Sequence, residues 1–170
     1  VMYHPAPPPE GSPFERDEFE FVELTNTGDA TIDLTGVRFV DGIEFDFTGS
    51  GVTSLLPGEV VVIVENLQAF ASRYNFDLVL AAGQYLGKLA NDGERVLLVG
   101  ALGETLHDFE YVDSWYPSTD GLGPSLVVDA PSSDPETWGD AATWRASGFQ
   151  LGSPGIDESG KVPTGGLQRI

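Results

Sequence analysis

His4 and His107 are the two side chains of this sequence that could transfer protons near neutral pH, and a serine or threonine nucleophile usually needs such a base. His4 lies among prolines, whereas His107 alternates with Phe109 and Tyr111, as is typical of one face of a strand. The sequence has no cysteine, HExxH motif, phosphate-binding glycine loop or nucleophile elbow. Acidic residues are so numerous that a carboxylate pair at the roughly 5–9 Å needed for glycoside hydrolysis is expected by chance. We therefore predict that the protein is not an enzyme and has no catalytic residues.

Three aspartates, Asp129, Asp134 and Asp140, are candidate metal ligands in a loop-rich stretch. Calcium binds about six to eight oxygen atoms, mostly from carboxylates and loop carbonyls. These residues do not follow the Asp-x-Asp-x-Asp-Gly pattern of an EF-hand, and aspartate is also a favoured residue in turns and caps. The cap interpretation is the favoured one. Ca²⁺ is the one cofactor for which the sequence offers candidate ligands.

Trp115 and Tyr116 are candidate ligand-binding residues, because aromatic rings at a protein surface can stack on sugar rings. The neighbouring Asp113 and Pro117 indicate a surface loop. The alternative is that both rings pack inward and contribute to the core. Trp144 is predicted to do so, as a plug at the open end of a sandwich.

The composition excludes several classes of partner. The chain has 170 residues, with 27 Asp and Glu against 8 Lys and Arg, and a formal net charge of −19. This excess of acid opposes binding to nucleic acid or to an anionic membrane. No apolar run approaches the ~18 residues of a membrane span, and we expect no membrane insertion. The sequence begins with Val and has no signal-peptide pattern, so we interpret it as a piece of a longer protein.

Short strands separated by Gly, Pro and Asn turns dominate the pattern. Ile43, Phe45 and Phe47 alternate with polar residues, which predicts a strand with one solvent-exposed face. The unbroken β-branched run at 60–64 predicts a central strand that is buried on both sides. One short helix is predicted at about 66–74, where apolar residues recur at helical spacing. This pattern favours an all-β fold, an antiparallel sandwich or barrel.

We expect one domain over 20–155. A Pro-rich segment, 1–19, is expected to pack on it, and 156–170 is expected to be a linker or tail. The isolated domain is expected to be a monomer. The predicted core consists of apolar residues on the inward faces of the strands: Val22, Leu24, Ile32, Leu34, Phe45, Val62, Val64, Val96, Leu98 and Leu126.

A series of motifs resembles bacterial lamin-tail domains when the motifs are taken in order, which is more specific than any one of them alone. They are MYHP at 2–5, EFVELTN at 20–26, DLTG at 33–36, LPGE at 56–59, LANDGE at 89–94, YP at 116–117, DGLGPSL at 120–126, WRAS at 144–147 and GSPG at 152–155. The sequence departs from the family at Val37, where the family usually carries Trp. The smaller residue leaves core volume that a neighbour such as Phe39 must fill.

The resemblance implies an immunoglobulin-like antiparallel β-sandwich. It also implies a non-catalytic module of a larger bacterial protein that is extracellular or on the cell surface. We therefore expect an interaction or spacer module that binds a protein or a surface polysaccharide through loops or a sheet edge. The alternative is a calcium-supported carbohydrate-binding module that uses Trp115 and Tyr116.

Overall fold

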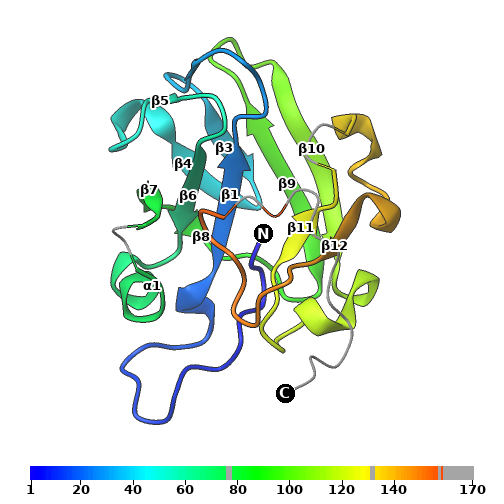
Figure 1. Ribbon diagram of the computed structural model, residues 1–170. Coiled ribbons are helices and arrows are strands. Elements are labelled where there is room, and N and C mark those ends of the chain that lie inside the picture. Colours follow the sequence, from blue (N-terminus) through cyan, green and yellow to red (C-terminus); the bar gives the residue numbers. More distant parts are fainter. Residues whose placement is uncertain (76–77, 131–132, 157, 159–170) are drawn as a thin grey trace.

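The computed structural model describes residues 1–75, 78–130, 133–156 and 158, and two main β-sheets form a sandwich in this part of the chain (Figure 1). The strands are β1 (Phe21–Thr25), β2 (Ile32–Asp33), β3 (Arg38–Asp41), β4 (Ile43–Asp46), β5 (Ser54–Leu55), β6 (Val60–Val64), β7 (Leu80–Gln84), β8 (Leu86–Gly87), β9 (Gly93–Val99), β10 (Thr105–Val112), β11 (Leu126–Val128) and β12 (Trp144–Ala146). The helix is α1 (Leu67–Arg73), and the 3-10 turns are η1 (Asp17–Phe19), η2 (Phe47–Gly49), η4 (Asp113–Trp115), η5 (Pro117–Thr119), η6 (Pro135–Thr137) and η7 (Ala141–Thr143). The predicted all-β fold with one short helix is confirmed. Among the described helices, none has the length and apolar character needed to cross a membrane.

β6 is the centre of the first sheet, between β1 and β7. Its residues 61–64 are all buried, which confirms the predicted central strand. β1 pairs with β6 antiparallel, whereas β7 pairs with it parallel. The parallel pair departs from the expected antiparallel arrangement, and it arises because α1 carries the chain back across the sheet between the two strands. Asn66 begins this helix by accepting hydrogen bonds from the backbone N–H groups of Gln68 and Ala69.

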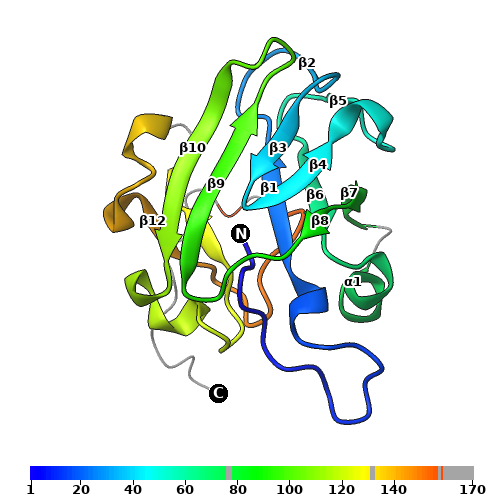
Figure 2. The same cartoon turned by 180° about the vertical axis from the view of Figure 1, so that it is seen from behind.

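The second sheet has the strand order β10-β9-β3-β4-β8, and all its pairs are antiparallel. Figure 2 shows β9 and β10 as a long hairpin beside β3 and β4. Gly42 makes the tight turn between β3 and β4 with a φ of 78°, and a Cβ there would lie 2.8 Å from the carbonyl oxygen of Arg95. This turn therefore requires glycine. The pairs β11–β12 and β2–β5 are small sheets of their own.

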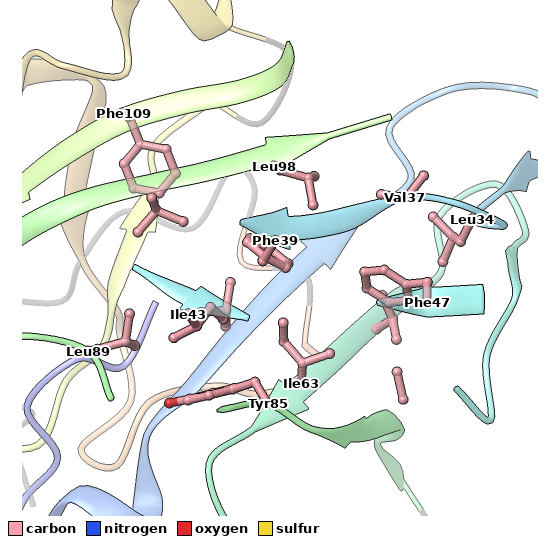
Figure 3. Packing of buried hydrophobic residues seen from close by; sticks show 14 of the residues in the cluster. Leu34, Val37, Phe39, Ile43, Phe47, Ile63, Tyr85, Leu89, Leu98 and Phe109 are labelled. Atoms are coloured by element: carbon pink, nitrogen blue, oxygen red, sulfur yellow. The ribbon is translucent and has the colours of Figure 1, made fainter. Parts of the chain in front are cut away.

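Side chains from both sheets meet in one large hydrophobic cluster, in which Phe39 and Ile43 approach Ile63 across the sandwich (Figure 3). Most predicted core residues are buried, and Leu24 and Phe45 are half-buried against the same cluster. The prediction for Ile32 is wrong, because its side chain is 43% exposed. β2 is two residues long and pairs only with β5, so Ile32 lies at the surface and Leu34 is the residue that is buried.

The first three residues belong to the packed structure. Met2 and Tyr3 are both buried, and Met2 pairs with Phe21 of β1. The Tyr3 hydroxyl lies 2.9 Å from the Thr119 hydroxyl oxygen. Val1 exchanges backbone hydrogen bonds with Leu126 of β11. The N-terminal segment therefore lies between β1 and β11.

Candidate functional site

Trp115 and Tyr116 are both half-buried at the junction of η4 and η5. The Trp115 ring centre lies 6.4 Å from that of Trp144, and the Tyr116 hydroxyl is 2.6 Å from the Trp144 carbonyl oxygen, to which it donates. Trp144 is buried, as predicted for the ring that would plug the open end of the sandwich. Both candidate sugar-binding residues thus lie against this plug, and the Tyr116 hydroxyl is already engaged.

The three candidate metal ligands have separate structural roles. Asp134 accepts a hydrogen bond from the Glu136 N–H at the start of η6, and Asp140 accepts one at the start of η7. Asp129 lies 3.1 Å from the Nε atom of Arg145. In the part of the chain that the structure describes, no group of three or more His, Cys, Asp or Glu side chains could hold a metal ion. Calcium binding stays a prediction.

Neither histidine is paired with a serine or threonine hydroxyl among the described residues. The Nε2 atom of His4 accepts a hydrogen bond from Arg16, so its Nδ1 proton is donated to Asp120 at 2.5 Å. His107 stacks on the ring of Trp138 with 4.4 Å between the ring centres. Burial lowers the pKa of His107, and its buried Nδ1 has no hydrogen-bond partner among the described residues. These contacts position aromatic and N-terminal segments, and among the described residues neither imidazole is hydrogen-bonded to a hydroxyl nucleophile.

Glu20 is a fully buried carboxyl group that the sequence pattern did not single out. Its Oε2 accepts hydrogen bonds from the Tyr85 hydroxyl and the Leu89 N–H, both at 2.9 Å. Burial raises its pKa to about 8, so the group is largely protonated at neutral pH. The only feature of the sequence that could have indicated this buried carboxyl group is an acidic residue at the first position of an apolar strand motif. Glu20 connects β1 to the segment that follows β7.

An apolar cavity of about 420 Å³ lies between β1 and β11. Val22–Thr25 and Leu126–Val128 line it, together with Phe109, His107 and Trp138. Ile156 and Glu158 also line the cavity. No local pattern in the sequence indicates this cavity, because the residues that line it are far apart along the chain.

Two loops carry a group of exposed apolar side chains, which we name the loop surface: Leu122, Phe149 and Leu151. Their exposed fractions are 63%, 41% and 40%. The Gln150 side chain joins the loops by donating a hydrogen bond to the Leu122 carbonyl oxygen at 2.7 Å. The Tyr74 hydroxyl donates to the Leu151 carbonyl oxygen and attaches the second loop to α1. The loop surface is therefore apolar and held in place by polar contacts.

The described fold defines the class of protein as an immunoglobulin-like β-sandwich. The family model of the lamin tail domain matches residues 1–113, and the chain belongs to this family. It is a family of non-enzymatic, immunoglobulin-like interaction domains. No curated protein matches the chain. The family match ends before Trp115, so the loop surface, the aromatic candidates and the three aspartates all lie outside the matched residues.

Proposed function

We propose that this domain is a non-catalytic interaction module of a larger extracellular bacterial protein, and that it binds a protein partner through the loop surface. The observation that carries the proposal is the exposure of three large apolar side chains on two loops that hydrogen bonds hold together. Exposed apolar groups that lie together mark interaction sites more often than scattered ones do. A pre-ordered surface also loses less conformational entropy on binding.

The charge of the chain supports one type of partner surface. The formal net charge is −19, so a partner with basic residues around an apolar contact would approach faster and in a preferred orientation. The apolar contact itself would supply most of the affinity, because hot spots are buried and desolvated. Binding should therefore weaken only modestly as the salt concentration rises.

The test uses the double substitution Leu122→Ser with Leu151→Ser. A matched control is Leu102→Ser, because Leu102 is 95% exposed in the β9–β10 turn and lies outside the loop surface. Secreted and surface proteins of the source bacterium are screened against the domain, and the affinity of each purified hit is then measured. We expect the double variant to bind about tenfold or more weakly, which corresponds to ~1.4 kcal/mol, and the control to bind normally. Equal affinity of all three proteins would refute the proposal.

A further inference from the structure

Residues 5–9, which we name the proline segment, contain four prolines and have no part in the loop surface. They form no helix, strand or turn, and their peptide bonds are trans. A proline ring holds φ at about −65°, and a residue that precedes a proline is restricted to extended ψ values. Ala6, Pro7 and Pro8 each precede a proline. The proline segment therefore has the polyproline II conformation, which uses no hydrogen bonds within the backbone.

Both ends of the loop that contains the proline segment are attached to the domain through one aromatic ring, that of Phe19. At the first end, Pro5 is buried, and the Ala6 carbonyl oxygen accepts a hydrogen bond from Arg73 of α1 at 3.1 Å. The Arg73 guanidinium carbon lies 3.6 Å from the centre of the Phe19 ring. At the other end, Phe14 packs edge to face against the same ring, with 6.1 Å between the ring centres. A segment that is ordered in this way before binding loses less entropy when a partner binds.

A tight turn ends the proline segment. The Ser12 N–H donates a hydrogen bond to the Pro9 carbonyl oxygen at 3.1 Å, across Glu10 and Gly11. Gly11 has a φ of 82°, which is the conformation that the third residue of a type II turn requires. In Figure 1 and Figure 2, the loop with this turn projects beyond α1 and away from both sheets. The proline segment is therefore presented at the edge of the molecule.

Two of the three edges of the proline segment are open to a partner. A polyproline II helix has three residues per turn, so Pro5 and Pro8 share one edge. Pro5 is buried and Pro8 is half-buried, and this edge therefore faces the domain. Pro7 and Pro9 lie on the other two edges, and both are exposed. A groove on a partner can contact both exposed rings at once.

Acidic side chains flank the proline segment. Glu10 follows it directly, Glu15 lies beyond the turn, and both are exposed. The chain as a whole has a formal net charge of −19. Lys or Arg side chains on the rim of the partner's groove would therefore be electrostatically complementary to this loop.

We propose that the proline segment is a second interaction surface of the domain, and that it docks in an aromatic-lined groove with a basic rim on a protein partner. Polyproline II segments dock in aromatic-lined grooves because proline rings pack on aromatic rings and the conformation is already formed. The contact uses none of the side chains of the loop surface, which are Leu122, Phe149 and Leu151.

The test uses two synthetic peptides as minimal models of such a groove. One is acetyl-Trp-Lys-Trp-Lys-amide. Its control, acetyl-Leu-Lys-Leu-Lys-amide, has the same charge and apolar side chains without aromatic rings. The amide NMR signal of Glu10 in the 170-residue protein reports the affinity of each peptide. We expect the Trp peptide to bind about fivefold or more tightly than the Leu peptide.

The variant Pro7→Ala with Pro9→Ala removes both exposed rings. Pro13→Ala is the matched control, because Pro13 is also exposed but lies beyond the turn. We expect the double variant to bind the Trp peptide about threefold or more weakly than the parent does, and the control to bind normally.

Two results would overturn the proposal. One is equal affinity of the parent for the two peptides, which would mean that charge alone attracts them. The other is equal affinity of the parent and the double proline variant for the Trp peptide. The variant Leu122→Ser with Leu151→Ser should keep the affinity of the parent, so the outcome does not depend on the function of the loop surface.

Discussion

Glu20 makes the stability of the domain depend on pH at the scale of a single residue. Burial raises its pKa from 4.5 to about 8, with further contributions from nearby Asp17 and Glu65. Between these two pH values the unfolded chain releases a proton that the folded chain retains, so the free energy of unfolding falls as pH rises. Glu20→Gln keeps an acceptor for Tyr85 and Leu89 but removes the titration. We expect this variant to be more stable than the parent by about 4 kcal/mol at pH 8 and nearly equal to it at pH 4.5.

Chemical denaturation at the two pH values measures this difference. Glu110→Gln is the matched control, because Glu110 is exposed on β10. It should leave the free energy of unfolding unchanged at both pH values. The account of Glu20 fails if the Glu20→Gln variant differs from the parent by the same amount at both.

A substitution at Trp115 distinguishes a packing role of this ring from a role in carbohydrate binding. Its half-buried ring packs against the hydrophobic cluster next to Trp144, so Trp115→Ala should reduce the free energy of unfolding by about 2 kcal/mol, less than for a fully buried ring. Urea denaturation measures the loss. A glycan array with and without calcium provides the second readout. Unchanged stability together with lost glycan retention would instead favour the carbohydrate-binding alternative.

The three loop aspartates lead to a prediction about calcium. Asp134 and Asp140 already cap 3-10 turns, and Asp129 lies beside Arg145. We therefore expect millimolar Ca²⁺ to raise the Tm no more than the same concentration of Mg²⁺ does. Differential scanning fluorimetry measures both shifts. A Tm shift that is clearly larger with Ca²⁺ than with Mg²⁺, and that the Asp140→Asn variant loses, would establish a metal site.

At the scale of the elements, Gly93 is a turn position that requires glycine. It begins β9 with a φ of 121°, and a Cβ there would collide with the carbonyl oxygen of Tyr111 on β10. Gly93→Ala should therefore destabilise the domain by about 3 kcal/mol, from backbone strain and displacement of the hairpin. Gly103 also has a positive φ, but a Cβ there meets no atom within 4 Å. Gly103→Ala should thus cost less than half as much in thermal denaturation, and equal losses would contradict this explanation.

Local patterns predicted the elements whose cause is local. The β-branched run of β6 and the apolar spacing of α1 identified a central strand and a helix, and both are present. The parallel pairing of β7 could not be predicted, because it depends on where α1 returns the chain. Ile32 was assigned to the core by alternation alone, although a two-residue edge strand has no partner layer to cover it.

The candidate sites also divide into features with a local cause, which the sequence predicts, and features that depend on contacts between distant segments. Cap residues such as Asp134 and Asp140 act within two positions of themselves, so the cap interpretation follows from the sequence. The Glu20 network, in contrast, joins residues 65 and 69 positions apart, and nothing in a local pattern indicates it. The loop surface likewise depends on a hydrogen bond between residues 28 positions apart.

At the scale of the whole molecule, the domain combines a β-sandwich with loops that the family match does not cover. The matched part contains both main sheets, while the loop surface comes from residues that follow it. Specificity in such a design resides in the loops, because the scaffold is shared and the loops vary without loss of the core. The proposed partner contact is therefore a property of this chain, supported by a fold common to its family.

Hydrogen exchange of the domain, recorded with and without its purified protein partner, tests the central proposal most directly. We expect new protection in the loops at 120–124 and 148–152, with the strands of both sheets unchanged. Protection confined to other surfaces, such as the exposed edge of β7, would contradict the assignment of the loop surface. Chemical conversion of the partner by the domain would contradict its non-catalytic role.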